Sequence, residues 1–182
     1  ASDVYKRQKE WFEDPWRVIV PRRGYLVVRV DGRAFHQFTK GLERPYSERL
    51  ARALDEAALG LAREMMGCRM AYGQSDEYSF LATDVERESE RMWFDGNVQK
   101  IASVGASVFT AGFARAFGGE KAASFDARVM LIPRAEEVAK YFLWRQLDAS
   151  ANSLNMLASA HYSHAELLGK TEREKHELLH AK

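Results

Sequence analysis

The stretch AYGQSDEYSF, residues 71–80, decides how the chain is organised, because two short apolar runs meet there at a polar break. CRMAYG (68–73) and EYSFLAT (77–83) have the composition of β-strands, and the residues between them predict a hairpin. The break holds two adjacent carboxylates, Asp76 and Glu77, which repel one another and are costly to remove from water. We therefore expect some other group to offset their placement.

The segments around the hairpin alternate between strand and helix patterns. Residues 24–32 (GYLVVRVDG) are β-branched and end at glycine, as strands often do, and apolar residues between Ser47 and Gly67 recur at helical spacing. The remaining predicted elements are a helix over 97–117, a strand over 125–133 and helices from 135 onward, with breaks near Ser150 and Gly169. The order β-α-β-β-α-β predicts an α+β, ferredoxin-like fold followed by helices.

This topology brings two distant aspartates together. A right-handed β-α-β crossover makes the first two strands parallel, so the end of the first strand and the turn after the second lie at one edge of the sheet. Asp31 and Asp76 are therefore expected to be neighbours. Alternation along the first strand places Val28 on an apolar face. We expect helices to cover that face only, which leaves the face of Arg29 and Asp31 open.

Composition limits the domain organisation and the setting. The 182 residues are 46% hydrophobic, enough for one compact core, so we expect a palm-like catalytic domain over 1–133 and a helical extension over 134–182 that is cut short at its C-terminus. The net charge of +1 leaves any nucleic-acid contact to local basic clusters. The single Cys68 and the lack of a membrane-length apolar run predict a reducing, cytoplasmic setting without a membrane.

The two aspartates admit a functional and a plain interpretation. Paired carboxylates near Arg29, Arg33 and Arg44 suit a Mg²⁺ site that also holds phosphates. In the plain interpretation, Asp31 begins a turn and Asp76 sits in a solvated hairpin, as aspartate often does. The pattern alone leaves both interpretations open.

Other candidate sites are weaker. His176 and His180, and likewise His161 and His164, could share a helix face, but no acidic partner accompanies them, so solvated helices are the better interpretation. The segment WRQ (144–146) is either an arginine and a glutamine that reach a ligand, or a packed tryptophan beside an exposed arginine. Periodicity does not decide between the two.

Four motifs together resemble a known family. VVRVDGRAFHQF (27–38), AYGQSDEYSF (71–80), FDARV (125–129) and WRQLDASANSLN (144–155) are similar to the tRNA-His guanylyltransferase family, including its Thg1-like relatives. The resemblance covers most of residues 24–182. It implies a polymerase-type palm and a nucleotidyltransferase that adds nucleotides in the 3′ to 5′ direction at the 5′ end of tRNA.

The resemblance also implies site residues. Asp31, the Gly32 carbonyl and Asp76 would hold two Mg²⁺ ions. The catalytic residues would be Asp31, Asp76 and Glu77, the last in a supporting role because its strand parity opposes that of Asp76. ATP and GTP would be substrates. The residues implied in nucleotide binding are Arg29, Asp31, Gly32, Arg33, Ala34, Phe35, His36, Arg44, Ser75, Asp76 and Lys100.

One departure from the family pattern narrows the expected activity. SANSLN (150–155) stands where eukaryotic members carry a His-Ile-Asn-Asn-Leu-Tyr-Asn-like signature, with Ser150 in place of the histidine and Asn152 retained. This resembles the Thg1-like branch, whose members tend toward templated 5′-end repair of several tRNAs. The resemblance is compatible with a homo-oligomer such as a tetramer. Alternative functions are a palm-fold nucleotide cyclase and a non-catalytic module that binds RNA or nucleotides.

Overall fold

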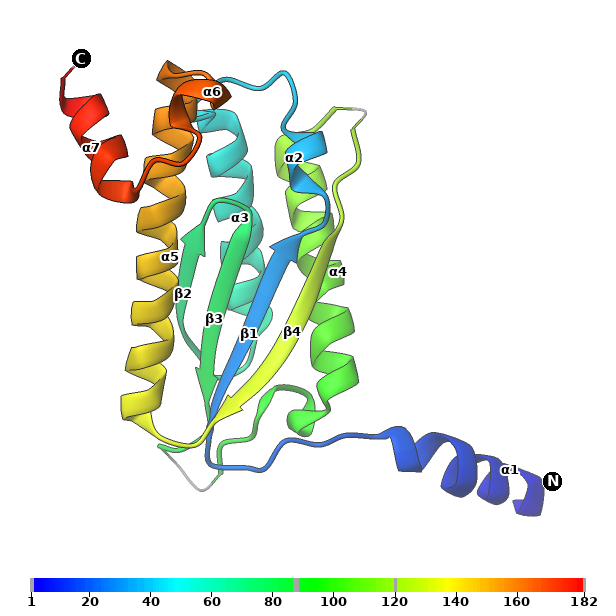
Figure 1. The fold of residues 1–182 in the computed structure, drawn as a ribbon. Helices are drawn as coiled ribbons and strands as arrows, with labels where there is room; N and C mark the ends of the chain where they lie inside the picture. Colours follow the sequence, from blue (N-terminus) through cyan, green and yellow to red (C-terminus); the bar gives the residue numbers. More distant parts are fainter. Residues whose placement is uncertain (1, 87–88, 120, 182) are drawn as a thin grey trace.

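The computed structural model describes residues 2–86, 89–119 and 121–181, and a four-stranded sheet forms its centre (Figure 1). The strands are β1 (Tyr25–Gly32), β2 (Cys68–Gln74), β3 (Glu77–Thr83) and β4 (Phe125–Ile132). Their order is β2-β3-β1-β4, and β1 pairs antiparallel with both β3 and β4. Because β3 also pairs antiparallel with β2, β1 and β2 run in the same direction without being neighbours. The predicted α+β class, hairpin and element order are confirmed.

Two helices, α3 (Glu48–Glu64) and α4 (Val98–Phe117), cover one face of the sheet, which is the predicted apolar face of β1. The two helices pack closely because small residues face each other: a Cβ added at Gly112 would lie 3.2 Å from Cα of Ala57. Gly67 follows α3 with a φ of +76°, as expected of a residue that ends a helix. Ser47 stands at the N-cap of α3, but its side chain makes no capping hydrogen bond.

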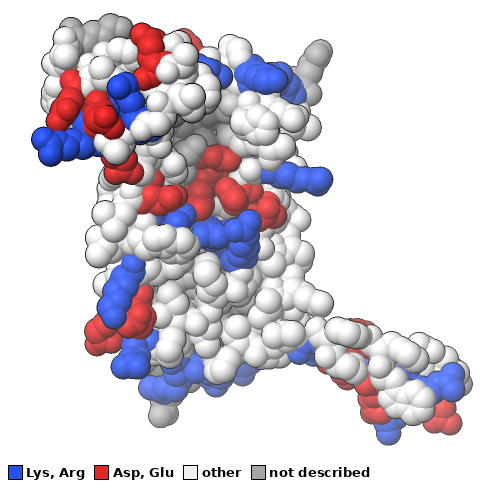
Figure 2. All heavy atoms as spheres, viewed as in Figure 1, with Lys and Arg blue, Asp and Glu red and all other residues white. Residues whose placement is uncertain are grey.

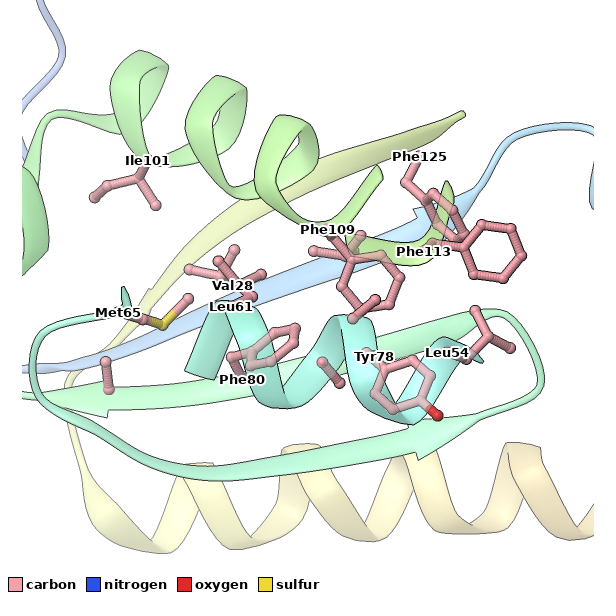
Figure 3. Packing of buried hydrophobic residues seen from close by; sticks show 14 of the residues in the cluster. Val28, Leu54, Leu61, Met65, Tyr78, Phe80, Ile101, Phe109, Phe113 and Phe125 are labelled. Atoms are coloured by element: carbon pink, nitrogen blue, oxygen red, sulfur yellow. The ribbon is translucent and has the colours of Figure 1, made fainter. Parts of the chain in front are cut away.

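Aromatic side chains fill the space between the sheet and these helices (Figure 3). Phe109 and Phe113 on α4 pack against Phe125 at the start of β4, with ring centroids 4.8 and 5.3 Å apart. Phe35, just after β1, joins them 5.5 Å from Phe125. Burying a side chain of this size stabilises a fold by roughly 1.5–3 kcal/mol. A tightly packed part of the core therefore lies beneath the end of β1, where Asp31 is located.

The opposite face of the sheet is partly covered, so the prediction of one helix-covered face is wrong. A further helix, α5 (Ala135–His161), lies along this face, where the Tyr141 hydroxyl is 2.9 Å from that of Ser79 on β3. The physical reason is that this face is not purely polar: Val27 points away from α3 and α4 and is fully buried. Asp31, at the end of the same face, keeps 34% of its side chain exposed.

The helix α5 runs through Ser150, so the break predicted there is wrong. A serine hydroxyl can bond back to the preceding turn inside a helix, and that of Ser150 donates to the Gln146 carbonyl at 3.0 Å. Two shorter helices follow, α6 (His164–Leu167) and α7 (Glu172–His180). The break predicted near Gly169 is confirmed, since this residue lies between them with a φ of +76°.

An N-terminal arm reaches away from the rest of the molecule (Figure 1). It consists of α1 (Ser2–Gln8), the π-helix η1 (Lys9–Glu13) and the 3₁₀ helix η2 (Asp14–Trp16). Its large apolar side chains are exposed, Trp11 by 64% and Trp16 by 71%. The two remaining short helices are α2 (Phe35–Phe38) and η3 (Trp93–Gly96). No helix in the described part of the chain is long and apolar enough to cross a membrane.

Candidate active site

Asp31 and Asp76 lie close together at one end of the sheet, as the topology predicted. Asp31 is the last residue but one of β1, and Asp76 lies in the tight turn between β2 and β3. The pairing of β1 with β3 extends to Val30 opposite Tyr78, so the end of β1 adjoins this turn. A Cβ built at Gly32 would lie 2.6 Å from Oδ2 of Asp76. Figure 2 shows a cluster of acidic side chains toward this end of the sheet, with basic side chains beside it.

Both carboxyl groups are in surroundings that disfavour their negative charge. Burial raises the pKa of Asp31, and the charges of Asp76, Glu77 and Asp126 raise it further, whereas Arg128 at 3.9 Å lowers it. Burial also raises the pKa of Asp76, although the hydroxyl of the preceding serine donates a hydrogen bond to Oδ1 at 3.0 Å and opposes this effect. The described side chains thus leave repulsion at this pair that a cation would relieve.

The donors of this pair fit a hard divalent cation whose remaining ligands come from a substrate. Mg²⁺ is usually bound through one or two carboxylates together with water and phosphate oxygens. Asp31 and Asp76 offer two carboxylates, and the Gly32 carbonyl adjoins them in the chain. Within the described ranges, no group of three or more His, Cys, Asp or Glu side chains is placed to hold a metal ion by itself. The site therefore suits an ion that arrives with, or is completed by, a nucleotide.

Glu77 is held by protein side chains, unlike the two aspartates. The Nη1 atom of Arg145 lies 3.0 and 2.9 Å from its two carboxylate oxygens, and Nε of Arg29 lies 3.7 Å from one of them. The Gln74 amide donates another hydrogen bond at 3.1 Å. The charge of Glu77 is therefore compensated inside the protein.

Arg145 belongs to the WRQ segment, for which the sequence left two interpretations open. The interpretation as a packed tryptophan beside an exposed arginine is wrong, because Trp144 is 52% exposed and Arg145 only 5%. The guanidinium carbon lies 3.7 Å from the centroid of the Trp144 ring, and Nη1 lies 3.4 Å from Asp148. The register of α5 turns Arg145 toward the sheet, where it reaches Glu77.

Two residues of β4 also belong to the site and were missed. Asp126 stands opposite Asp31 in the sheet, and Arg128 stands opposite Arg29. The alternation within FDARV places Asp126 and Arg128 on one face, which was a usable signal. Only the pairing of β4 with β1 aligns them with the other site residues, and a single sequence does not specify that register.

The segment implied in nucleotide binding forms the loop and short helix after β1. Arg33 and His36 are exposed, and Ala34 adopts a left-handed φ of 51°. The Phe35 ring is packed in the core, 6.0 Å from that of Phe113. This segment therefore presents its main chain and the Arg33 and His36 side chains outward.

A hollow of about 490 Å³ opens beside this segment. Arg44 and Ser75 border it, with apolar side chains of α3 on one wall and Met156 of α5 on another. Ser75 adjoins Asp76, so the hollow and the acidic pair share a boundary. The volume lies within the range of roughly 300–1,000 Å³ that is typical of sites for small molecules.

Lys100 is not brought to this site within the chain. It lies in the first turn of α4, with its amine 4.6 Å from the centroid of the Phe94 ring. The other end of α4, at Phe117, is the end that packs against Phe38 near the acidic pair. A helix rises about 1.5 Å per residue, so Lys100 is displaced from that end by about 25 Å along the axis.

Comparison with known proteins shows the family of the chain. The model of the family described as tRNAHis guanylyltransferase (Thg1) matches residues 5–133, which is more than half of the chain. The chain belongs to the tRNA(His) guanylyltransferase family. The resemblance carried by the four motifs is thereby confirmed.

Solved structures of family members share the fold. A bacterial Thg1-like protein in complex with ATP is 39% identical with a TM-score of 0.94, and the match covers 98% of this chain and 79% of that one. A bacterial Thg1-like protein in complex with GTP is 40% identical with a TM-score of 0.83, over 88% of this chain and 77% of that one. The guanylyltransferase of Saccharomyces cerevisiae, at 24% identity and a TM-score of 0.72 over 94% of this chain and 82% of that one, supports the fold alone.

Curated guanylyltransferases are similar in sequence to this family member over most of its length. That of Debaryomyces hansenii is 33% identical over 141 residues, which cover 71% of this chain and 51% of the relative. That of Schizosaccharomyces pombe is 32% identical over 178 residues, which cover 87% of this chain and 66% of the relative. The chain thus spans about half to two thirds of the length of these relatives.

Proposed function

We propose that this family member is a Mg²⁺-dependent nucleotidyltransferase that adds nucleotides in the 3′ to 5′ direction at the 5′ end of tRNA. The observation that carries the proposal is the Asp31–Asp76 pair, which no described basic side chain reaches within hydrogen-bond distance, beside a hollow of about 490 Å³. The names of the relatives support tRNA as the substrate, and the ATP and GTP complexes of bacterial Thg1-like proteins support the nucleotides.

In this proposal Asp31, the Gly32 carbonyl and Asp76 hold two Mg²⁺ ions. When bound, the ions lower the pKa of the attacking 3′-hydroxyl and neutralise charge on the triphosphate. The contribution of the chain is to keep the two carboxylates at a fixed separation. Strand pairing holds Asp31, and the close approach of Gly32 to Asp76 and to the Phe35 ring restricts the turn.

The basic and polar residues around the hollow have separate tasks. Arg44 on its rim and the exposed Arg33 are placed to contact phosphates of ATP or GTP, as guanidinium groups commonly do. Ser75 and Phe35 border the space for the rest of the nucleotide. Arg29 is engaged by Glu77 at 3.7 Å, so we assign it to that carboxylate rather than to a phosphate.

The test is a 5′-extension assay on several tRNAs that lack their first nucleotide, with ATP, GTP and Mg²⁺. We expect the parent protein to lengthen the 5′ end and Asp76→Asn to lose this activity by at least about 10²-fold. Asp95→Asn is the matched control, because Asp95 pairs with Arg91 at 3.5 Å on the exposed segment before α4 and takes no part in the site. Equal activity of the Asp76 and Asp95 variants would contradict the cation assignment.

The same assay distinguishes the other functions. Formation of a cyclic nucleotide from GTP without RNA would indicate a cyclase, and tRNA binding without extension would indicate a binding module. Ser150 stands in place of the histidine of the eukaryotic signature, and its hydroxyl is turned back to its own helix. We therefore propose templated repair, in which extension follows the complementary base in each of the truncated tRNAs.

The setting and assembly of the protein are further parts of the proposal. We propose residues 1–133 as the catalytic palm and 134–182 as its helical extension, which contributes Arg145 to the site. The exposed aromatic side chains of the N-terminal arm favour a homo-oligomer, such as a tetramer, that covers them. The free Cys68 favours a reducing, cytoplasmic location. Light scattering of the parent protein and of a Trp11→Ser, Trp16→Ser variant measures the assembly, which the double change should weaken.

A further inference from the structure

The three carboxylates next to one another at the acidic end of the sheet differ in how their oxygens are used. Both oxygens of Glu77 accept from Arg145, and one of them also accepts from Gln74. By contrast, Asp76 accepts hydrogen bonds from its own turn, from the Ser75 hydroxyl and its own main chain, and the ion pair of Asp31 is long, at 3.9 Å. The oxygens of Glu77 are therefore occupied, while those of the aspartates remain available to a ligand.

The arginine that occupies Glu77 is itself held in place. Arg145 is 5% exposed, and its guanidinium is stacked 3.7 Å from the centroid of the Trp144 ring. Nη1 also faces Asp148 at 3.4 Å, and α5, which carries Arg145, is bonded to β3 through the hydroxyls of Tyr141 and Ser79. A guanidinium fixed by packing on several sides keeps its hydrogen bonds without a large loss of side-chain entropy. Several contacts therefore hold the Arg145 guanidinium against Glu77.

The number of carboxylates that reach a cation decides how tightly it binds without a substrate. Charge count tunes the affinity of oxygen-ligand sites, and Mg²⁺ sites of phosphoryl-transfer enzymes leave positions for phosphate oxygens. A third free carboxylate at this site would bind the cation more tightly and fill a position that a nucleotide phosphate needs. A residue that withholds this carboxylate would keep the cation shell open.

We infer that Arg145 is a positioning residue that withholds Glu77 from the cation, so that Asp31 and Asp76 bind it alone and nucleotide phosphates complete its shell. The inference rests on the proposed cation site. Glu77 contributes its charge through Arg145 and Arg29 rather than through a bond to the ion. Removal of Arg145 takes away the donor that both oxygens of Glu77 share and leaves only Gln74 at 3.1 Å and Arg29 at 3.7 Å, so that this carboxylate, next to Asp76 in the chain, can turn to the cation.

The experiment measures Mn²⁺ binding to the full chain by electron paramagnetic resonance of free Mn²⁺, with and without GTP. We expect Arg145→Gln to bind Mn²⁺ in the absence of GTP about tenfold more tightly than the parent, within the 10–100-fold range by which residues that support ligands shift metal affinity. Glu77→Gln alone should change the affinity by less than about threefold, and adding it to Arg145→Gln should remove the gain. Arg145→Lys, which keeps the charge beside Glu77, should behave like the parent.

A tenfold or greater loss of Mn²⁺ affinity in Glu77→Gln would overturn the inference, because Glu77 would then be a ligand. Unchanged Mn²⁺ affinity in a folded Arg145→Gln protein would overturn it as well. If near-ultraviolet circular dichroism shows that Arg145→Gln does not fold, the Glu77→Gln result decides. A parent protein that binds no Mn²⁺ even with GTP would refute the proposed cation site itself, which distinguishes the two failures.

Discussion

Gly32→Ala is the change that tests most directly whether close packing holds the acidic pair in place. The added Cβ would lie 2.6 Å from Oδ2 of Asp76, and 2.5 Å from Cδ2 of Phe35. The Phe35 ring cannot retreat easily, because it packs 5.1 Å from the ring of Phe38 and 5.5 Å from that of Phe125. The more mobile partner is therefore the Asp76 carboxylate.

The size of the effect follows from these distances. Ordinary van der Waals contact begins near 3.4 Å, so Asp76 must move by about 0.8 Å. A misplacement on the order of 1 Å in a catalytic group can reduce activity by about 10²-fold. Overpacking against Phe35 should cost roughly 1–3 kcal/mol of unfolding free energy, which lowers Tm by roughly 2–12 °C in a chain of this length.

Differential scanning calorimetry, Mn²⁺ titration and the 5′-extension assay measure these losses. Gly60→Ala is the matched control, because it adds the same methyl group to the exposed side of α3, where a Cβ meets nothing within 4 Å. Alanine in place of a helical glycine should stabilise the protein by roughly 0.5–1 kcal/mol and leave Mn²⁺ binding unchanged. A Gly32→Ala protein with parental Tm, Mn²⁺ affinity and activity would refute the argument that Gly32 is required for the placement of Asp76.

Other changes test the charges of the site and the core beside it. The pKa of Asp76 is raised in the folded protein, whereas in the unfolded chain it has the ordinary value of about 4. In cation-free buffer the free energy of unfolding should therefore fall as the pH rises from about 4 through the raised pKa, because the folded protein retains a proton that the unfolded chain has released. Asp76→Asn should therefore have a higher Tm than the parent at neutral pH in EDTA, and a lower Tm would contradict this. Arg145→Ala should destabilise the protein by up to about 3 kcal/mol in urea unfolding, because it leaves the charge of Glu77 to Gln74 and the more distant Arg29, and adding Glu77→Ala should restore part of the loss. Tyr78→Phe removes the hydroxyl that donates to Asp55 and should cost about 1.5–3 kcal/mol, whereas no change in the urea midpoint would show that the bond contributes little.

The chemistry-bearing part of the fold could be predicted because its signals are local. Apolar alternation and glycine marked β1, the polar break marked the β2–β3 turn, and the right-handed crossover then placed Asp31 near Asp76. In the structure, the contact between Asp31 and Asp76 follows from the pairing of β1 with β3 rather than from the parallel direction of β1 and β2. β3 lies beside β1 in the sheet, so the start of β3 brings Asp76 to the end of β1.

The features that escaped prediction depend on register and on packing between distant segments. Whether Arg145 or Trp144 faces the sheet depends on how α5 is rotated, and the sequence left both interpretations open. The largely covered carboxylate of Glu77 decides for the arginine, since an ion pair compensates the cost of burying it. The placement of Asp126 required the register of β4 against β1, which no local pattern specifies.

The continuity of α5 through Ser150 has a mechanical consequence. Its 27 residues form one rod of about 40 Å, with Arg145 at the acidic pair and Met156 on the wall of the hollow. A rod without a hinge between these points transmits a tilt at one of them to the other. The wall of the hollow and the partner of Glu77 are therefore carried by one and the same helix.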